Sequence, residues 1–272
     1  GEWLRKIHPN VDVKIIVDDI LDDDDSAGWA KFTVDYLGFV PEAVFTSEDY
    51  GHAYAKFMGC EHVQVDKARK TFPISGTLVR GDPRKYFKFL EPCVRAYFAR
   101  RIAVVGAEST GTTTLSKDLA KHYHTVWAPE YGRMYSEGKL YSSNASDWDS
   151  YEFENIATAQ NLLEDQMAGQ SPDGLVICDT NALATSIWHE RYMKSRDPKV
   201  EGIAKTHNHD LYILTGDEIP WEDDGTRDGE HIRHWMHQRF IERLEEDHKK
   251  YIIVNGPREE RVKAAVAAID NL

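Results

Sequence analysis

The sequence predicts an α/β protein built from parallel β-sheets and crossover helices. In residues 11–65, short apolar runs alternate with segments that carry apolar residues at helical spacing, and the same rhythm restarts after Pro92. This alternation is typical of strands that pair in parallel and are joined by helices lying on the sheet faces. The third observation is a glycine-containing turn at residues 106–111, between an apolar strand and a helix.

Residues 1–98 are predicted to form a first, smaller domain. Its expected strands and helices are strands at 13–17, 42–46 and 62–65 and helices at 29–37 and 53–58. Residues 99–272 are predicted to form the second domain, a five-stranded parallel sheet. Its expected strands are 102–105, 125–127, 174–178, 211–214 and 251–254. Its expected helices begin near Thr112 and cover 153–167, 182–193, 231–248 and 257–269, with Pro257 at the first helical position.

Composition favours an enzyme that acts on small molecules. The 272 residues are 41% hydrophobic, which is enough for a substantial core, and they carry a net charge of −13 at pH 7. An acidic chain is a poor partner for nucleic acid. Cys60, Cys93 and Cys178 have no CxxC spacing and are predicted to be reduced thiols. No apolar run reaches the length of a membrane span. We therefore expect a cytoplasmic protein without a membrane or nucleic-acid partner.

Residues 106–114 are predicted to form a phosphate-binding loop (P-loop). Gly106 and Gly111 allow positive φ and a close approach of the backbone to phosphate oxygens. The loop amides and the following helix N-terminus would surround a phosphate chain, and Thr113 stands where a hydroxyl would bind Mg²⁺. The predicted ATP-binding residues of the loop are Gly106, Glu108, Ser109, Thr110, Gly111, Thr112, Thr113 and Thr114.

Thr112 occupies the position at which this loop pattern has lysine. Losing a charge-assisted hydrogen bond of that kind costs roughly 1.5–3 kcal/mol in binding. In a transition state, one well-placed donor is worth about 10²–10³ in rate. The loop therefore indicates a nucleotide kinase whose phosphate charge must be met by other groups.

Two carboxylates are candidates for the chemistry. Asp179 ends an apolar strand, and the crevice beyond the carboxyl ends of such strands is where α/β proteins bind ligands. Glu130 follows the strand at 125–127. Either residue is suited to accept a proton from a substrate hydroxyl, and Asp179 is also a candidate Mg²⁺ ligand. A capping or surface role is the alternative for both.

Two further segments are candidates for nucleotide contacts. Residues 221–229 are polar and contain glycine, which indicates a mobile lid whose Arg227 would clamp the transferred phosphoryl group. Asn255 and Gly256 follow the last strand and are expected to pass along an adenine ring. His207 and His209 lack the spacing of a zinc site, and we interpret them as ordinary polar residues.

Taken together, these motifs resemble the bifunctional NadR family, in which a nicotinamide-mononucleotide adenylyltransferase is joined to a ribosylnicotinamide kinase. The resemblance covers essentially the whole chain. It is carried by Gly-Ala-Glu-Ser-Thr-Gly at 106–111, Ala-Pro-Glu-Tyr-Gly-Arg at 128–133, Cys-Asp-Thr at 178–180 and the segment 221–227. In the first half, residues 45–48, 74–80 and 82–89 look like the adenylyltransferase motifs and the linker of that family.

The resemblance implies that residues 1–98 are the C-terminal part of a Rossmann-like nucleotidyltransferase domain. Ser75, Thr77 and Arg80 would then contact the ATP triphosphate in a partial site. The His-x-Gly-His motif of such enzymes is not found in the sequence. We therefore expect an N-terminally truncated domain that is inactive in adenylyl transfer, and an apolar sheet edge that favours a homo-oligomer.

For residues 99–272 the resemblance implies Mg²⁺- and ATP-dependent phosphorylation of nicotinamide riboside in NAD salvage. Asp179 or Glu130 would orient or deprotonate the 5′-hydroxyl. Arg133, Arg227 and Lys117 are candidates to replace the lysine charge, and Trp127 and Tyr131 would stack on the cationic nicotinamide ring. The alternative function is a non-catalytic sensor of ATP or nicotinamide nucleotides. The absence of lysine at position 112 argues for this alternative, whereas the expected lid and the two carboxylates argue against it.

Overall fold

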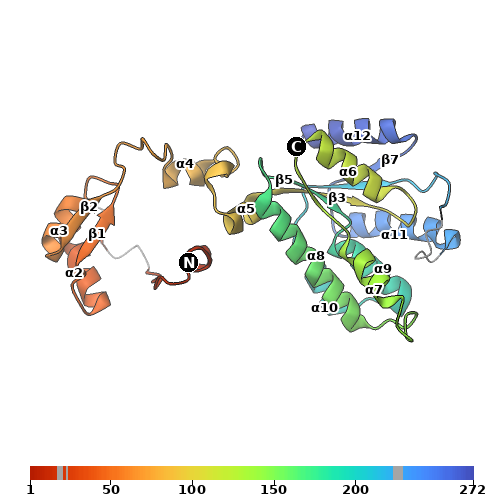
Figure 1. Ribbon diagram of the computed structural model, residues 1–272, viewed down its shortest axis with the longest axis horizontal. Coiled ribbons are helices and arrows are strands. Elements are labelled where there is room, and N and C mark those ends of the chain that lie inside the picture. The colour runs from red at the N-terminus through yellow and green to blue at the C-terminus, as the bar shows by residue number, and fades with distance from the viewer. Residues whose placement is uncertain (17–20, 23, 223–228) are drawn as a thin grey trace. The chain divides into compact units, whose positions relative to one another are not determined.

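The computed structural model describes residues 1–16, 21–22, 24–222 and 229–272. The chain divides into two compact units, Gly1–Tyr86 and Phe87–Leu272 (Figure 1). The boundary expected at residues 98 and 99 is therefore corrected to residues 86 and 87. The reason is that α5 (Pro92–Phe98) packs against α8 (Ser150–Gln170), which belongs to the second unit.

The first unit holds a two-stranded parallel sheet, in which β1 (Ala43–Thr46) pairs with β2 (Glu61–Gln64). Its helices are α1 (Glu2–Ile7), α2 (Ser26–Leu37), α3 (Gly51–Met58) and α4 (Gly76–Gly81). The strand expected at residues 13–17 is not formed by residues 13–16, and residue 17 lies outside the described residues. Apolar character alone does not make a strand, because its backbone must also find a ladder partner.

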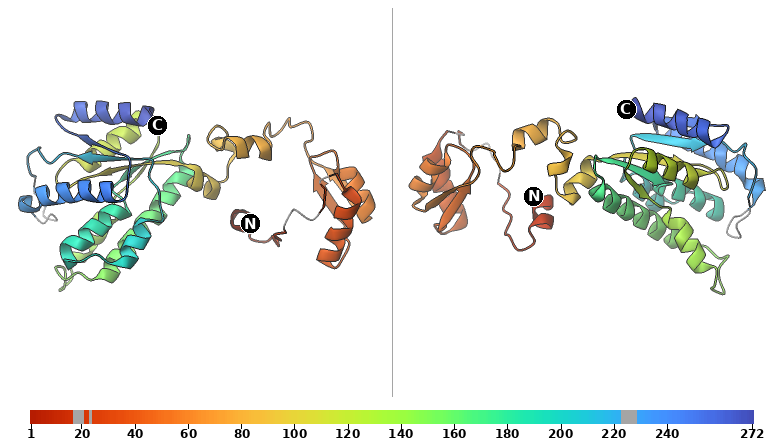
Figure 2. Two further views of the ribbon diagram at one scale, coloured as in Figure 1. Left: turned by 180° about the vertical axis from the view of Figure 1, so that it is seen from behind. Right: turned by 45° about the horizontal axis from the view of Figure 1, so that its top comes forward.

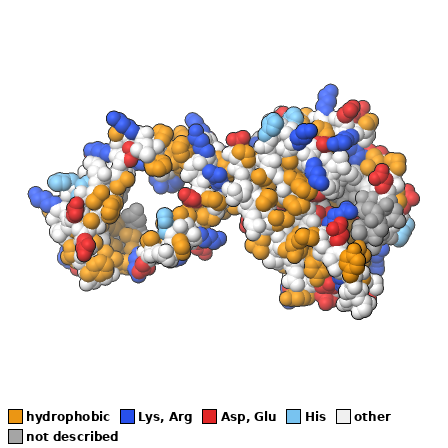
Figure 3. Space-filling model, viewed as in Figure 1, with side chains coloured by type: hydrophobic (Ala, Val, Ile, Leu, Met, Phe, Trp, Pro, Cys, Tyr) orange, Lys and Arg blue, Asp and Glu red, His pale blue; other side chains and the backbone are white. Residues whose placement is uncertain are grey.

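Large apolar side chains are exposed on this first unit, as the space-filling view illustrates (Figure 3). Phe45 on β1 is 69% exposed, and Ile15 is 65% exposed. Helix α3 contacts both strands and α2 contacts α3, but the unit buries few residues. The apolar sheet edge that the sequence led us to expect stays a prediction.

The second unit is built on a five-stranded sheet in which all strands are parallel. Its order is β4 (Val126–Ala128), β5 (Leu175–Asp179), β3 (Arg100–Val105), β6 (Leu211–Thr215) and β7 (Tyr251–Val254). β3 is central, and it pairs with β5 at Val104↔Asp179 and with β6 at Val105↔Leu214. The predicted α/β fold with a five-stranded parallel sheet is confirmed.

Helices cover both faces of this sheet (Figure 2). On one face α6 (Thr112–His122) and α12 (Arg258–Asp270) enclose a core that includes Ile102, Val104 and Leu119. On the other face α9 (Ala182–Met193) and α11 (Arg233–Glu246) enclose a core that includes Ala103 and Val105. Alternate residues of β3 thus supply both cores, which explains why its sequence is apolar throughout.

The remaining helices of the second unit lie beside these layers. They are η1 (Phe87–Phe89), α7 (Tyr131–Lys139), α10 (Pro198–Ala204) and η2 (Glu230–Ile232). Helix α8 begins with a capping box in which Asp149 and Glu152 satisfy each other's backbone N–H groups. Pro257 is the N-cap of α12, not its first helical residue as predicted, because its ψ of 156° is extended. No helix among the described residues is long and apolar enough to cross a membrane.

Candidate active site

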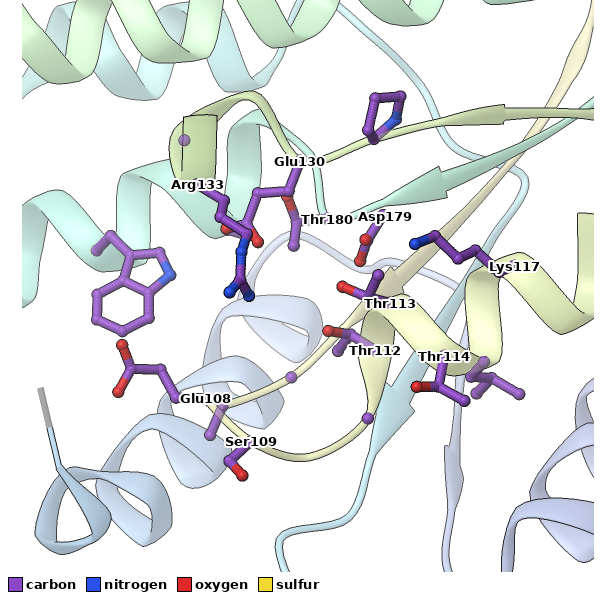
Figure 4. Close-up of a pocket in the computed structure, with 18 of the residues that line it drawn as sticks. Glu108, Ser109, Thr112, Thr113, Thr114, Lys117, Glu130, Arg133, Asp179 and Thr180 are labelled. Carbon is purple, nitrogen blue, oxygen red and sulfur yellow. The ribbon is translucent and has the colours of Figure 1, made fainter. Parts of the chain in front are cut away.

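A cavity of about 780 Å³ opens at the carboxyl ends of the strands in the second unit. The loop after β3, Glu130 after β4, Asp179 at the end of β5 and Gly256 after β7 all line it (Figure 4). Parallel strands bring their carboxyl ends to one edge of the sheet, so segments far apart in sequence meet here. The predicted phosphate loop and both predicted carboxylates lie in this one cavity.

The loop between β3 and α6 has the backbone that phosphate binding needs. Gly111 has φ +83° and Ser109 has φ +56°, both in the left-handed region. A Cβ on Gly106 would overlap the Thr215 hydroxyl and approach the Thr110 hydroxyl at 2.8 Å. Gly106 is therefore required by close packing, because a side chain at this position would deform the loop.

The side chain of Thr110 is structural. It is 1% exposed, it donates to the Ala107 carbonyl at 2.6 Å, and its hydroxyl lies 2.7 Å from that of Thr215. Thr110 is not among the residues that line the cavity. Its predicted contact with ATP is therefore limited to the backbone, whereas Glu108, Ser109, Thr112, Thr113 and Thr114 line the cavity.

Two buried arginines hold the loop in place although residue 112 is not lysine. Arg261 donates from Nη1 to the Thr110 carbonyl at 2.7 Å and pairs with Glu218 at 2.6 Å. Arg233 donates from Nη2 to the Ile219 carbonyl at 2.8 Å and lies 3.4 Å from the Ser109 carbonyl. The loop is thus preorganised by groups outside itself, which spares part of the ordering cost when a phosphate binds.

Asp179 lies next to the phosphate loop. Its carboxylate accepts a hydrogen bond from the Thr113 hydroxyl, and its Oδ1 is buried without a hydrogen-bond partner among the described residues (Figure 4). The next residue, Thr180, has φ +63°, which is costly for a β-branched residue. A buried oxygen without a partner, beside a strained residue, is typical of a site prepared for a ligand.

The two carboxylates differ in pKa. Burial raises the pKa of Asp179 to about 6, although the Thr113 hydrogen bond and the charges of Lys117 and Arg133 act in the opposite direction. Burial, followed by the charge of Asp179, raises the pKa of Glu130 to about 8, and Arg133 opposes this. At neutral pH, Asp179 is therefore mainly ionised and Glu130 mainly protonated. Such a separation is a mark of acid–base sites.

Lys117 and Arg133 place positive charge at the cavity. Figure 4 shows the Lys117 ammonium directed toward Asp179 and the Arg133 guanidinium directed into the cavity near Glu130. Lys117 lies over the Trp127 ring at 4.6 Å, and Arg133 pairs with Glu137 at 3.0 Å. Arg258 and Arg261 also line the cavity, but each pairs with a carboxylate.

Aromatic side chains that the sequence did not single out form one wall of the cavity. Trp148, Phe153, Trp188 and Tyr192 all line it, and Trp148 lies 5.4 Å from Tyr192 between ring centroids. Trp127 lines the cavity too, but its Nε1 donates to Ser116 at 3.0 Å. Tyr131 lines a separate shallow pocket. The available sequence signal was the pair Trp188 and Tyr192, which stand four residues apart on α9.

The other predicted residues lie as follows. Gly256 lines the cavity and donates its N–H to Glu218 at 2.7 Å, whereas the side chain of Asn255 lies against Gly216. Arg227 lies outside the described residues, although Glu222, earlier in the expected lid, donates its N–H to the Ser109 hydroxyl at 2.8 Å. In the first unit, Ser75 caps α4, and Thr77 and Arg80 are exposed. Their adenylyltransferase role stays a prediction.

Gly106→Ala is expected to weaken binding of ATP by at least about tenfold, because the new methyl group displaces Thr215 and deforms the loop. Equilibrium titration with a fluorescent ATP analogue measures this effect. Gly202→Ala is the control, since its Cβ would meet no atom within 4 Å. Equal affinities of Gly106→Ala and wild type would contradict the packing argument.

Glu130→Gln is expected to stabilise the protein increasingly as the pH rises. A folded-state pKa of about 8, above the usual 4.5, means that the native protein binds this proton more tightly than the unfolded chain does. Wild-type stability therefore falls as the pH rises between those values. We expect a gain on the order of 1–3 kcal/mol at about pH 9 and almost none at about pH 4.

Urea unfolding at several pH values checks this prediction, with the exposed Glu259→Gln as the control. The control is expected to change the free energy of unfolding by less than about 0.5 kcal/mol at every pH. A gain in Glu130→Gln that did not depend on pH would mean that Glu130 is not held protonated by its surroundings.

The geometry agrees with comparisons to known proteins. A family model described as an AAA domain matches residues 101–261, which is more than half of the chain. The trifunctional NAD biosynthesis/regulator protein NadR of Escherichia coli (strain K12) is 30% identical over 233 residues, covering 84% of this chain and 56% of that protein. The chain thus spans about half the length of this curated relative.

Two solved structures share the fold. A NadR protein in complex with NR has a TM-score of 0.77 at 21% identity, and a NadR protein in complex with NAD and AMP-PNP has a TM-score of 0.73 at 18% identity. Each match covers 99% of this chain and 81% of the other. By its matched domain the chain belongs to the AAA-domain family, and by its sequence relatives it belongs to the NadR family.

Proposed function

We propose that the second unit is a kinase that transfers the γ-phosphoryl group of ATP to the 5′-hydroxyl of nicotinamide riboside. The observation that carries this proposal is the single cavity that joins a phosphate loop, two carboxylates of different pKa and an aromatic wall. Membership of the NadR family supports a role in NAD salvage. In the reaction the 5′-oxygen attacks the γ-phosphorus, the bond to the β–γ bridging oxygen breaks, and ADP leaves.

ATP is proposed to bind with its phosphates in the loop of residues 106–114. The loop amides and the N-terminus of α6 supply partial positive charge, and Thr112 and Thr114 add hydroxyl groups on the cavity wall. Gly256, one of the two residues that the sequence predicted for this role, and its neighbour Pro257 line the cavity and are proposed to lie along the adenine ring. A solved structure that shares this fold is a complex with NAD and AMP-PNP, which supports binding of ATP.

The residues present fit a Mg²⁺ ion. The Thr113 hydroxyl and the Asp179 carboxylate are hard oxygen ligands, and Asp179 Oδ1 is buried without a partner among the described residues. The ion would neutralise charge on the transferred phosphoryl group. Burial of Asp179 holds its carboxylate in one place, next to the loop.

Glu130 is proposed to take the proton from the 5′-hydroxyl. Its pKa of about 8 leaves a minor ionised fraction at neutral pH, and this ionised form is proposed to act as the base. Arg133 lies beside Glu130 with its guanidinium directed into the cavity. Arg133 and Lys117 are proposed to meet part of the phosphate charge that a lysine at position 112 would have met. Arg227 keeps its proposed role in the lid.

The aromatic wall is proposed to bind the nicotinamide ring. That ring carries a positive charge in the riboside, and the faces of Trp and Tyr attract cations. Trp148, Trp188 and Tyr192 line the cavity. These residues replace Tyr131 in the proposed site, because Tyr131 does not line the cavity.

A second candidate function, a non-catalytic sensor of ATP or nicotinamide nucleotides, is favoured by Thr112 in the loop. For the first unit we propose a partial nucleotidyltransferase domain, in which Ser75, Thr77 and Arg80 belong to the site. Adenylyl transfer by this chain does not form part of the proposal.

Asp179→Ala is expected to lower riboside-dependent release of ADP by at least about 100-fold, because it removes a metal ligand and a fixed charge beside the phosphates. A coupled assay with nicotinamide riboside, ATP and Mg²⁺ measures this. Thr112→Lys is measured in parallel. Turnover in the wild type that is lost in Asp179→Ala supports a kinase that works without the loop lysine. Turnover that appears only in Thr112→Lys would support the sensor.

Trp148→Leu is expected to raise the KM for nicotinamide riboside by about tenfold or more, with the KM for ATP nearly unchanged, since leucine keeps the apolar contact but removes the π-face. Trp235→Leu is the matched control, because Trp235 is an exposed residue of α11 and does not line the cavity. An unchanged KM for the riboside in Trp148→Leu would show that the ring binds elsewhere.

A further inference from the structure

A buried chain of polar side chains connects the two segments that carry the carboxylates. Its members are Gln160 and Glu164 on α8, His209 just before β6, and Asn181 at the start of α9. Gln160 and Asn181 are 1% exposed, Glu164 is 0% exposed and His209 is 9% exposed. Polar groups so deeply buried are costly unless each finds a partner, so their contacts need an explanation.

At one end the chain holds the backbone directly after Asp179. Asn181 caps α9, because its Oδ1 accepts the N–H of Ala184 at 3.1 Å. This bond fixes the orientation of the amide, so Nδ2 must donate. Nδ2 lies 3.3 Å from His209 Nδ1 and 3.1 Å from the Tyr212 hydroxyl. His209 Nδ1 is therefore an acceptor, and the ring proton is on Nε2.

From His209 the direction of each hydrogen bond follows. His209 Nε2 donates to Glu164 Oε2 at 3.0 Å, and Gln160 Nε2 donates to Glu164 Oε1 at 3.3 Å. The orientation of the Gln160 amide is thereby fixed, and its Oε1 accepts the backbone N–H of Tyr131 at 2.9 Å. Tyr131 is the first residue of α7 and follows Glu130. The chain thus ends on the backbone that carries the second carboxylate.

We infer that Gln160, Glu164, His209 and Asn181 form a positioning network that holds Glu130 at a fixed place relative to Asp179. The inference rests on the proposed kinase function, and it assigns these residues an effect on turnover without contact to substrate. A helix N-terminus leaves N–H groups without intrahelical partners. At the start of α7, the Gln160 side chain accepts one such N–H group, that of Tyr131. The side chain of Glu130, the N-cap residue of α7, accepts none.

A metal site is the competing explanation for part of the network. The ligand atoms of Glu164, Cys178 and His209 lie within 4.8 Å of one another. However, His209 Nε2 and Glu164 Oε2 are at hydrogen-bond distance, with the proton assigned to Nε2 by the Asn181 amide. A metal at this nitrogen would need to displace that proton. The hydrogen-bonded network accounts for the same atoms without an ion.

The test compares Gln160→Leu with Asn161→Leu, its neighbour on α8. Asn161 is 6% exposed and also loses two hydrogen bonds on substitution, to the Ile203 carbonyl at 3.1 Å and the Thr206 hydroxyl at 2.8 Å. In the ADP-release assay we expect kcat to fall at least about tenfold in Gln160→Leu, with both KM values within about twofold, because Glu130 is misplaced after substrates bind. Asn161→Leu is expected to keep kcat within about twofold.

Gln160→Glu tests the role of the acceptor. Two adjacent buried carboxyl groups hold a proton between them, so this variant retains an acceptor for Tyr131 and a donor for Glu164. Its kcat is expected to lie clearly above that of Gln160→Leu. Equal losses of kcat in Gln160→Leu and Asn161→Leu, no loss in Gln160→Leu, or stoichiometric zinc in the purified protein would each overturn the inference.

Hydrogen–deuterium exchange separates this inference from the proposed function. Gln160→Leu is expected to accelerate exchange in the peptide that contains Tyr131, whereas Asn161→Leu is not. A wild type that shows no riboside-dependent turnover defeats the proposed function, and the exchange data then still decide whether the network holds this segment. Unchanged exchange in Gln160→Leu would overturn the network itself.

Discussion

The parallel pairing of β4, β5, β3, β6 and β7 is the constraint on which the site depends. Because all five strands run in one direction, their carboxyl ends meet at one edge, and the segments that follow them line one cavity. The pairing of Val104 with Asp179 places that carboxylate beside the loop that begins at Gly106. A sheet with one strand reversed would send its following segment to the opposite edge.

Packing keeps the phosphate loop in shape although position 112 carries no lysine, but packing does not replace the chemical role of the lysine charge. Arg261 and Arg233 bind or approach loop carbonyls, and the hydroxyls of Thr110 and Thr215 fill the space under Gly106. These contacts keep the loop shaped for a phosphate. They do not supply a mobile cation at the transferred group, and for that role the cavity offers Lys117 and Arg133.

The two acidic groups of the cavity differ in pKa because of their surroundings, not because one is an aspartate and the other a glutamate. Asp179 accepts a hydrogen bond from Thr113 and lies near the positive charges of Lys117 and Arg133, whereas Glu130 faces the negative charge of Asp179. The first therefore ionises near pH 6 and the second near pH 8. The side chains of Gln160 and Asn181 accept backbone N–H groups in the segments that follow Glu130 and Asp179.

The sequence by itself determined the fold class, the five strands of the second unit, the phosphate loop and the candidates Asp179 and Glu130. These features are local, because apolar runs, glycine positions and the residue after a strand can each be recognised from a few neighbouring residues. The sequence was wrong about a strand at residues 13–16 and about the unit boundary, since both depend on which partner the segment packs against.

The aromatic wall, the structural role of Thr110 and the network through His209 are visible only in the tertiary structure. Trp148 and Tyr192 are 44 positions apart in the printed sequence, yet their rings lie 5.4 Å apart. His209, interpreted from its spacing as an ordinary polar residue, forms a hydrogen bond with Glu164 on helix α8. Contacts between distant segments arise from the packing of α8 and α9 against the sheet, and no local pattern encodes them.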